Sequence, residues 1–437
     1  MAALLFTLLA WRWNANAFVS NTRQNTYRLK TTGHQQPFDP VRPKYYTSTP
    51  EPRVKLPLPP DVCAQTGVTL SRYILEQLRV HPEMQGIDSV FTSLQTACKA
   101  IAQLIRNAHF RDMHGPQDGG GSVNVQGEEQ KKLDVAANDV LKKALQWSGK
   151  FVSLTSEEED DPVTLWDNVL LTADTESKYI AAFDPLDGSS NVDAGIPTGT
   201  IFGIFASNPS SDGCMEDEIS VQERFLQDTL QPGRNLVAAG YCLYSSAVTL
   251  VLSLGHGVVG FTLDESIGEF RLTHPHMIIP TRGKTYSFNE GNRPDWSPSL
   301  QRYIGNLQHG LGESKQRYTS RYIGSLAGDV HRTLLYGGIF GYPADRKNPN
   351  GKLRLLYEAA PVAFLVEQAG GKALAGTDRV LDVVPHSIHQ RVPLILGSPD
   401  DVDEFFELQR HSLDTLADDD AVKAMSNYLT REMAMIE

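Results

Sequence analysis

Two aspartates flank a proline and a leucine in the stretch FDPLDGSSN, residues 183–191, and their spacing suits the binding of a metal ion. The proline ring fixes the backbone between Asp184 and Asp187, so both carboxylates and the carbonyl oxygen of Leu186 can turn toward one point. Hard divalent cations prefer oxygen ligands of this kind, and Mg²⁺ usually shares a few carboxylates with a substrate phosphate. The stretch therefore predicts a magnesium site.

The same stretch continues into a glycine-serine turn that could bind a phosphate. Gly188 allows the backbone to approach a ligand closely, and the hydroxyl groups of Ser189 and Ser190 can donate to phosphate oxygens together with peptide N–H groups. A glycine-serine turn alone is common in proteins. Its direct fusion to the two aspartates indicates a metal ion beside a phosphate group.

Further carboxylates lie elsewhere in the chain. Glu157 and Glu158 follow a short apolar run, Glu128 and Asp134 lie upstream of that run, and Glu358 lies far downstream. Any one of these acidic groups could instead cap a helix or lie in a solvated turn. Together with the aspartates and the glycine-serine turn, they favour one metal and phosphate site built from separate segments.

The hydrophobic pattern predicts the elements that position these groups. Runs of β-branched and aromatic residues at 150–156 and 179–184 indicate strands, and each runs directly into acidic residues. Apolar residues at helical spacing, and further apolar runs, predict the other elements. These are helices at 68–79, 91–109 and around 133–141, a strand at 200–207, buried structure over 235–264, strands at 269–274 and 337–343, and a helix within 352–374 that stops at Gly370 and Gly371.

Length and composition limit the class of protein. A chain of 437 residues is too long for one compact core of ordinary size, which favours two α/β domains. Its formal net charge of -12 argues against nucleic acid or a membrane surface as a partner of the mature protein. The four cysteines form no CxxC pair, so the sequence indicates neither a zinc site nor a disulfide framework.

Residues 1–60 are expected to be a targeting presequence followed by a linker. The segment MAALLFTLLAWRW is apolar but too short to span a bilayer, and residues 37–60 are rich in proline and threonine without an apolar period. The join ANAFVS resembles the boundary in the two-part presequences of algae whose plastids have extra membranes. We therefore expect a plastid (chloroplast) location, with a cytoplasmic protein carrying a disordered tail as the alternative.

Several longer motifs resemble those of the fructose-1,6-bisphosphatases, within the wider family of magnesium-dependent, lithium-sensitive sugar-phosphate and inositol phosphatases. The motifs stand in the family's order between about Val68 and Phe406: SEEED, FDPLDGSSN, GTIFGIF, QPGRNLVAAGY, YSFNEGN, RYIGSLAGDVHRTLLYGGIFGYP and NGKLRLLYEAAP. The resemblance, to the plastid-like subtype of class 1, implies a layered α/β/α/β/α sandwich in two domains, the sugar phosphatase fold. The expected domains are an N-terminal phosphatase domain with the metal loop at 61–255 and a C-terminal sugar-phosphate-binding domain at 256–437. A homotetramer is also implied.

Carried over position by position, the resemblance assigns roles to the acidic residues. The implied metal ligands, for two or more Mg²⁺ per subunit with Mn²⁺ as an alternative ion, are Glu157, Asp184, Leu186 through its carbonyl, Asp187 and Glu358. Glu158 and Asp134 resemble the residues that orient and deprotonate the attacking water, and Glu128 stands where the family often has aspartate. This arrangement suits hydrolysis of a phosphate ester, because metal ions clamp the attacking and leaving oxygens.

The resemblance also implies where the sugar phosphate binds. Besides Gly188, Ser189 and Ser190, the implied substrate-binding residues are Asn289, Tyr322, Tyr342, Lys352, Arg354 and an Arg321 lent by a neighbouring subunit. Without the motif, residues 345–354 would be interpreted as a solvated loop and a helix start. Asn292 stands where many non-plastid members carry a tyrosine, which we attribute to the subtype.

Departures from the family concern regulation. The stretch PEMQGI at 82–87 replaces the glycine turn that holds AMP in non-plastid members, and Ala206 replaces an arginine, while Lys178 and Tyr179 remain. We therefore expect weak or absent inhibition by AMP. Cys214 matches one cysteine of the regulatory loop in plant plastid enzymes but lacks the partner cysteines, so an inert thiol is expected.

The predicted function is hydrolysis of the 1-phosphate of D-fructose 1,6-bisphosphate, which gives fructose 6-phosphate and inorganic phosphate. A sedoheptulose-1,7-bisphosphatase is the alternative within the enzyme class, since it would share the metal loop. A non-catalytic protein that binds sugar phosphates is the alternative outside that class. Such a protein usually loses a metal ligand or the water-activating carboxylate, whereas this chain keeps them all.

Overall fold

A computed structural model describes residues 67–111, 131–164, 178–207 and 226–417. All of them belong to one compact unit, Pro50–Glu437. Within these ranges, none of the helices has the length and apolar character needed to cross a membrane.

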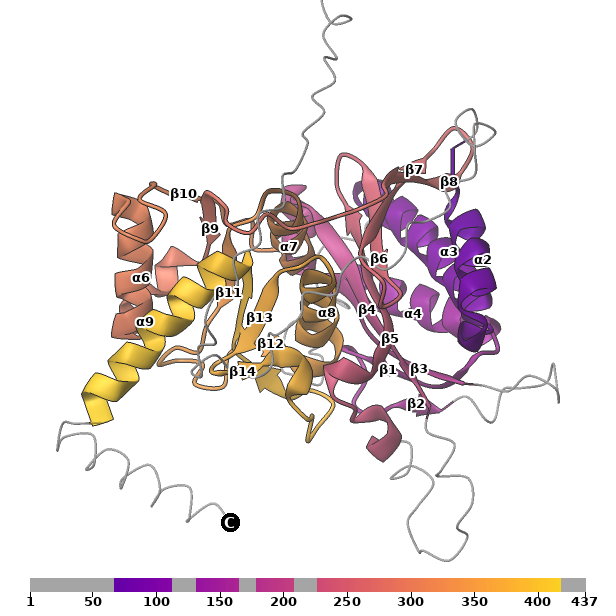
Figure 1. The fold of residues 1–437 in the computed structure, drawn as a ribbon. Helices are drawn as coiled ribbons and strands as arrows, with labels where there is room; N and C mark the ends of the chain where they lie inside the picture. Colours follow the sequence, from indigo (N-terminus) through magenta and orange to yellow (C-terminus); the bar gives the residue numbers. More distant parts are fainter. Residues whose placement is uncertain (1–66, 112–130, 165–177, 208–225, 418–437) are drawn as a thin grey trace, which may run out of the picture. The chain divides into compact units, whose positions relative to one another are not determined.

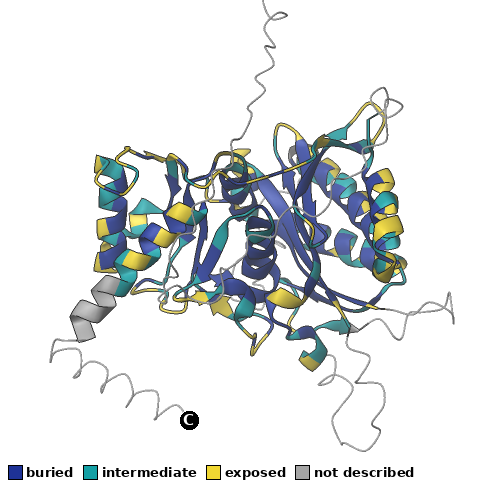
Figure 2. Ribbon diagram, in the orientation of Figure 1, coloured by how far each residue is buried: buried dark blue, intermediate teal, exposed yellow. Residues whose placement is uncertain are grey.

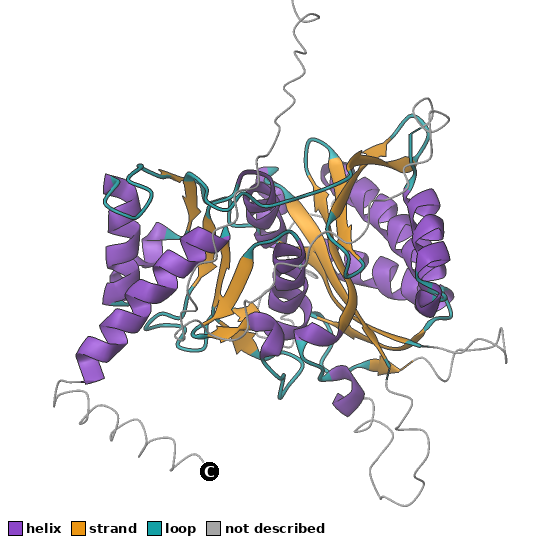
Figure 3. Cartoon of the chain, viewed as in Figure 1, coloured by secondary structure: helices purple, strands orange, loops and turns teal. Residues whose placement is uncertain are grey.

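An eight-stranded sheet forms the first half of this unit, and its strands follow one another almost in chain order (Figures 1 and 3). The order across the sheet is β2 (Val163–Thr164), β1 (Phe151–Ser156), β3 (Tyr179–Asp187), β4 (Thr198–Ala206), β5 (Leu236–Tyr244), β6 (Val248–Ser253), β7 (Val259–Asp264) and β8 (Glu269–His274). Only β1 and β3 pair in parallel; the other neighbours are antiparallel. The strands predicted at 150–156, 179–184, 200–207 and 269–274 are confirmed.

Three amphipathic helices cover one face of this sheet: α2 (Leu70–Val80), α3 (Ile87–Arg106) and α4 (Lys132–Trp147). They bury their apolar stripes against the side chains of one strand face, such as Ala181 and Phe183 of β3. Successive strand residues point to opposite faces, so Ile180 and Ala182 enter a different core on the other side. The three helices predicted in this region are confirmed.

A second, six-stranded sheet lies in the C-terminal half. Its order is β10 (Thr319–Ser320), β9 (Thr285–Ser287), β11 (Ile339–Tyr342), β16 (Leu394–Gly397), β13 (Lys372–Ala375) and β14 (Asp378–Arg379). A separate antiparallel pair joins β12 (Leu353–Arg354) to β15 (Arg391–Val392). The strand predicted at 337–343 is confirmed as β11.

Two helices lie between the sheets and two lie outside the second sheet. The middle core contains α7 (Leu326–Tyr336) and α8 (Ala360–Gln368), while α6 (Pro298–His309) and α9 (Pro399–Ala417) pack on the outer face. Figure 2 shows the sheets and the middle helices largely buried, with exposed residues on the outer helices. The order is therefore helix, sheet, helix, sheet, helix, as the resemblance implied.

Short turns of 3₁₀ helix connect these elements. They are η2 (Pro82–Met84), η3 (Ala108–Arg111), η6 (Ser189–Ala194), η8 (Gly233–Asn235), η9 (Glu290–Asp295) and η11 (Val380–Asp382). The domain boundary predicted at 255/256 lies between β6 and β7, whereas the first sheet continues to His274. The division into two domains stays a prediction.

The segment predicted as a helix within 352–374 differs from that expectation. It begins with β12, continues as a π-helical turn, η10 (Leu355–Ala359), and becomes α-helical only in α8, before β13. Pro361 lies in the first turn of α8, directly after this π-helical turn. A π-helical turn is wider than an α-helical one and often occurs at functional sites.

One partly buried histidine of α7, on the side that contacts the first sheet, makes stability depend on pH. Burial, and secondarily the charge of His274, lowers the pKa of His331 from 6.5 to about 4, and its Nδ1 lies 2.7 Å from the Tyr241 hydroxyl. Between these pH values the unfolded chain binds the proton and the folded one does not, so stability falls as pH falls through this window.

We expect His331 to cost the wild-type protein up to about 3 kcal/mol of unfolding free energy between pH 7 and pH 4. Urea unfolding at both pH values checks this, with His331→Gln as the variant that cannot titrate. The variant should lose less stability than the wild type over the same interval. Parallel losses in the two proteins would contradict the assignment.

Candidate active site

The acidic residues that follow β1 and those at the end of β3 meet because these strands are parallel neighbours. Ser156 pairs with Phe183 in the register, and the N–H of Glu157 donates to the Phe183 carbonyl at 3.2 Å. Glu157 therefore follows β1 beside the point where β3 reaches Asp184. The carboxyl ends of parallel strands lie at the same sheet edge, which brings the two segments together without any sequence proximity.

The DPLD motif lies in an irregular end of β3 rather than in a free loop. The register with β4 shifts between Asp184 and Asp187, as expected where a proline interrupts the ladder. The Thr200 hydroxyl donates to the Pro185 carbonyl at 2.8 Å, and the N–H of Leu186 donates to Asp184 Oδ1 at 2.9 Å. These bonds hold the motif in one shape.

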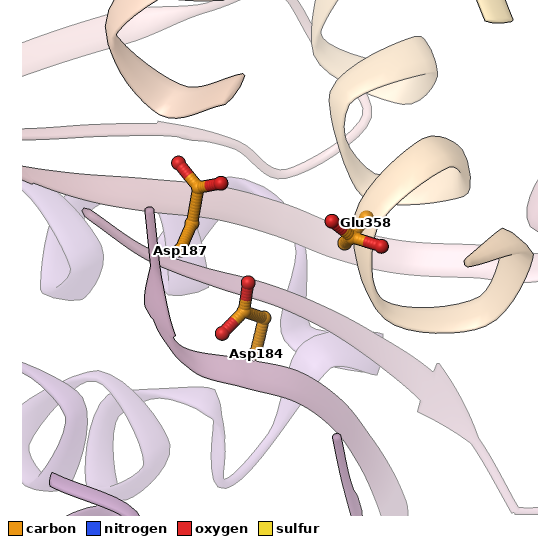
Figure 4. A group of neighbouring side chains, drawn as sticks. All are labelled: Asp184, Asp187 and Glu358. Carbon is orange, nitrogen blue, oxygen red and sulfur yellow. The ribbon is translucent and has the colours of Figure 1, made fainter. Parts of the chain in front are cut away.

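Glu358 approaches the two aspartates from the π-helical turn η10. One carboxylate oxygen from each of Asp184, Asp187 and Glu358 lies within 4.8 Å of the others, and all three residues are buried. Figure 4 shows the aspartates along β3 and Glu358 facing them from the helical turn. Residues far apart in the chain thus form one cluster.

The negative charges in this cluster repel one another. Burial, followed by the charges of Glu157, Asp187 and Glu358, raises the pKa of Asp184 well above its ordinary value. Burial and the charge of Glu157 likewise raise the pKa of Glu358, although Arg354 counteracts this. Carboxylates held this close in a dry environment need cations or protons to balance them.

Asp187 differs from Asp184 because the N-terminus of α7 supports it. Its carboxylate accepts hydrogen bonds from the Ser325 hydroxyl at 3.0 Å, the Leu326 N–H at 3.2 Å and the Ala327 N–H at 2.9 Å. Burial raises the pKa of Asp187, and these donors lower it. The N-terminus of a helix favours a negative charge, so α7 fixes this carboxylate in place.

Arg354 provides positive charge inside the cluster. Its Nη2 lies 3.1 Å from Glu157 Oε1, and its backbone N–H donates to Glu358 Oε2 at 2.6 Å. The side chain is buried, so the guanidinium group joins the segment after β1 to the segment before α8. The residues present suit divalent cations, because buried carboxylates outnumber this arginine and offer the hard oxygen donors that such ions prefer.

Two of the predicted water-activating residues lie in the described ranges. Glu158 follows Glu157, and its N–H donates to the Ser156 hydroxyl at 3.2 Å. Asp134 is buried in the first turn of α4, where its Oδ2 accepts from the Lys131 N–H at 3.0 Å. Glu128 lies outside the described residues. Their joint action on a water molecule stays a prediction.

The glycine-serine turn begins the 3₁₀ helix η6 beside the N-terminus of α7. Gly188 has φ 74° and ψ 26°, a left-handed conformation that favours glycine. A Cβ atom there would lie 3.2 Å from the Ser325 Cβ, so the turn and α7 approach closely. Ser189 is partly buried and Ser190 is exposed. Phosphate binding at this turn stays a prediction.

Some of the predicted sugar-phosphate residues come together. The Lys352 Nζ lies 5.8 Å from the centre of the Tyr342 ring, and a hydrogen bond with Tyr342 contributes to the raised pKa of Tyr322, whose main cause is burial. Asn289 instead caps η9, where its Oδ1 accepts from the Gly291 N–H at 3.1 Å. Arg321 is exposed and donates to the Ser320 carbonyl at 2.9 Å.

The region predicted to lack an AMP site is internally bonded. The Tyr179 hydroxyl donates to the Gln85 carbonyl at 3.2 Å, which ties the start of β3 to the stretch 82–87. Ala206 is exposed at the end of β4. Cys214 lies outside the described residues. The effect of AMP itself stays a prediction.

Sequence reasoning missed the groups that hold the acidic residues in place. Ser325 and the N-terminus of α7 support Asp187, and Thr200 holds the DPLD motif from the neighbouring strand. The sequence carried a signal for the first of these, since a serine followed by an apolar helical run is typical of a helix start. No local pattern indicates that the helix start faces Asp187.

Comparisons with known proteins identify the family of this chain. Two family models match the chain, described as "Fructose-1-6-bisphosphatase, N-terminal domain" over residues 68–275 and "Fructose-1-6-bisphosphatase, C-terminal domain" over residues 279–410. Together they span most of the chain and every described element that contributes to the acidic cluster.

Relatives from plants and a solved protozoan structure are similar over most of their length. The chain is 50% identical over 347 residues to the chloroplastic fructose-1,6-bisphosphatase of Brassica napus, covering 77% of this chain and 80% of that protein. It is 48% identical to a cytosolic enzyme of Oryza sativa subsp. indica, with 77% and 94% covered. The crystal structure of Leishmania major fructose-1,6-bisphosphatase in holo form matches with a TM-score of 0.70 at 41% identity, covering 79% of this chain and 99% of that one.

Proposed function

This chain belongs to the fructose-1,6-bisphosphatase family and hydrolyses D-fructose 1,6-bisphosphate, and we propose that the cluster of Asp184, Asp187 and Glu358 is its catalytic centre. Hydrolysis at the 1-phosphate gives fructose 6-phosphate and inorganic phosphate. The observation that supports this location is that one carboxylate oxygen from each of the three buried residues lies within 4.8 Å of the other two. Carboxylates so close together, at the end of a sheet and beside a glycine-serine turn, suit a metal ion next to a phosphate.

The family is metal-dependent, and we propose that two or more Mg²⁺ ions bind each subunit, with Mn²⁺ as an alternative. The proposed ligands are Glu157, Asp184, Asp187, Glu358 and the carbonyl oxygen of Leu186. The donors are all oxygens, and the raised pKa values of the buried carboxylates support the need for added positive charge. When bound, such ions neutralise phosphate charge and lower the pKa of a coordinated water molecule.

Glu158 and Asp134 are the proposed groups that orient and deprotonate the attacking water, with Glu128 as a third carboxylate from outside the described residues. The position of α4 supports this role. The Ser156 hydroxyl donates to Asn138 of α4 at 2.8 Å, so the helix that carries Asp134 lies directly beside the segment that carries Glu158.

The proposed phosphate contacts lie on two sides of the centre. Gly188, Ser189 and Ser190 would receive the 1-phosphate, because they directly follow Asp187. Tyr322, Tyr342 and Lys352 are close to one another, which supports a second pocket for the 6-phosphate together with Asn289. Arg354 forms an ion pair with Glu157, so it would act on the substrate from the side where the proposed metal ligands lie.

We propose a homotetramer in which Arg321 serves a neighbouring subunit. The exposure of this arginine supports the proposal, since its guanidinium group is accessible at the surface of the single chain. Bidentate contacts to phosphate are a common use of such an arginine.

We propose that the protein acts in a plastid. The similar relatives from Brassica napus and Spinacia oleracea are named chloroplastic enzymes, and residues 1–60 have the composition expected of a presequence and linker. A relative from rice of nearly equal identity is named cytosolic, so a cytoplasmic location is the alternative.

Release of inorganic phosphate tests the function. The purified full chain should release phosphate from fructose 1,6-bisphosphate when Mg²⁺ is present and not after treatment with a chelator. Release should be faster than from sedoheptulose 1,7-bisphosphate and should be unchanged by AMP. Equal or faster turnover of the sedoheptulose sugar would contradict the substrate assignment. Binding of the sugar without any phosphate release would favour the non-catalytic alternative.

A further inference from the structure

We infer that His389, which lies outside every sequence motif that indicated the site, positions the Glu157–Glu158 segment relative to Glu358. The inference rests on the catalytic centre proposed above. His389 lies between η11 and β15, far along the chain from both groups of acidic residues. Its two ring nitrogens nevertheless contact a neighbour of each group.

One ring nitrogen holds the turn after β1. His389 Nε2 lies 3.0 Å from the carbonyl oxygen of Glu159. A carbonyl oxygen only accepts hydrogen bonds, so Nε2 carries the proton and donates it to this bond. The bonded carbonyl follows Glu157 and Glu158 directly, so its orientation affects the direction of both carboxylates.

The other ring nitrogen meets the turn that carries Glu358. His389 Nδ1 lies 2.8 Å from the hydroxyl of Tyr357, the residue before Glu358, and the two rings pack edge to face with centres 5.8 Å apart. With the proton on Nε2, Nδ1 accepts from Tyr357 while the ring is neutral. Burial lowers the pKa of His389, which favours that neutral form. Tyr357 therefore fixes the tautomer that Glu159 requires.

The loop that carries His389 is firmly attached on the Glu358 side. The N–H of Leu355 donates to the Gln390 carbonyl at 2.8 Å, and Arg354 pairs with Arg391 in the β12–β15 ladder. The backbone that carries the His389 imidazole is thus held in place by the second half of the chain. The bond from the imidazole to Glu159 crosses to the first half.

Glu159 is also held from the opposite side, by its side chain. The Glu159 side chain accepts from Asn138 at 2.9 Å and from Lys142, both on α4, which anchors it toward the helix layer. His389 holds the backbone of the same residue toward Glu358. We therefore assign His389 a positioning role: it holds the Glu159 backbone, while Arg354 holds the Glu157 carboxylate. Without the His389 bond, the backbone of the Glu157–Glu158 segment would be held less rigidly and metal binding would weaken.

Two variants, each of which keeps one of the two ring-nitrogen positions, distinguish this role from simple packing. The amide nitrogen of His389→Gln can occupy the position of Nε2 and keep the bond to Glu159. The shorter side chain of His389→Asn reaches only the position of Nδ1 and leaves that carbonyl unpaired. His389→Ala removes both contacts. His386→Ala, an exposed histidine of the same loop, is the matched control.

We expect kcat of His389→Ala and His389→Asn to fall about 10- to 100-fold, as for other residues that orient metal ligands. The Mg²⁺ concentration for half-maximal rate should rise about 10-fold, while KM for fructose 1,6-bisphosphate changes less than about 2-fold. His389→Gln should stay within about 5-fold of the wild type, the size of one modest hydrogen-bond difference. His386→Ala should match the wild type.

Binding of Mn²⁺ to the substrate-free full chain, followed by electron paramagnetic resonance, gives a readout independent of turnover. Affinity should fall about 10-fold in His389→Ala and His389→Asn and be retained in His389→Gln. Equal impairment of the glutamine and asparagine variants, or normal Mn²⁺ affinity in both, would overturn the inference. If His389→Ala does not fold, the comparison of these two variants still decides. Failure of the proposed function itself would be seen separately, as a wild-type chain that binds Mn²⁺ but releases no phosphate.

Discussion

Asp184→Asn is expected to abolish turnover and yet leave the metal-free protein as stable as the wild type, or more stable. The carboxylate is buried, and the surrounding acids raise its pKa well above the ordinary value. An asparagine resembles the protonated aspartic acid in shape and carries no charge. Its amide oxygen can still accept the 2.9 Å hydrogen bond from the Leu186 N–H. The variant thus removes repulsion and keeps the local hydrogen bond.

The loss of activity follows from the same change. A neutral amide binds Mg²⁺ more weakly than a carboxylate, so the variant should lose several kcal/mol of transition-state stabilisation. Such a loss lowers the rate at least about a thousand-fold. Phosphate release and thermal unfolding, each with and without Mg²⁺, check the two halves of the prediction. Mg²⁺ should raise the melting temperature of the wild type and not of the variant. A variant with near-normal turnover would remove Asp184 from the proposed centre.

Asp187→Ala should also abolish turnover, but it should destabilise the metal-free protein, in contrast to Asp184→Asn. Its carboxylate accepts three hydrogen bonds from the N-terminus of α7. Removing it leaves buried donors without an acceptor, at about 1–3 kcal/mol for each unsatisfied group. Relief of charge repulsion offsets part of this cost. We expect a net loss of about 2–4 kcal/mol in the free energy of unfolding, measured in urea without Mg²⁺.

Ser325→Ala is the matched control for this prediction. It removes the side-chain donor and the cap of α7, at about 1–2 kcal/mol, and keeps the Asp187 carboxylate. Its activity should therefore remain within about 10-fold of the wild type. If Asp187→Ala proved as stable as the wild type without metal, α7 would not be held through this carboxylate.

Local patterns predicted most elements because each face of the sheets must be buried. The stretch 179–183 is apolar throughout and lies inside the first sheet, where both faces are covered. The failure at 352–374 has the same origin. Its apolar residues suit a buried helix, and only the pairing of β12 with β15 decides that the segment begins as a strand.

The types of residue at the site could also be predicted in part from the sequence. FDPLDGSSN combines the proposed metal and phosphate ligands within one stretch, and SEEED begins at the end of a strand, β1. The residues that contact these stretches could not be predicted, because they come from the other half of the chain. Arg354 illustrates this: its contact with the substrate stays a prediction, and the structure adds its buried contacts with Glu157 and Glu358.

The sequence by itself determined the family, the layered class of fold and the types of ligand at the site, because these depend on local residue chemistry and on periodic burial. Only the tertiary structure decided how Asp184, Asp187 and Glu358 converge and which groups steady them. The N-terminus of α7 faces Asp187, and His389 spans from Tyr357 to Glu159. Such contacts depend on how separate elements pack, and a side chain's distance along the chain carries no information about its neighbours in space.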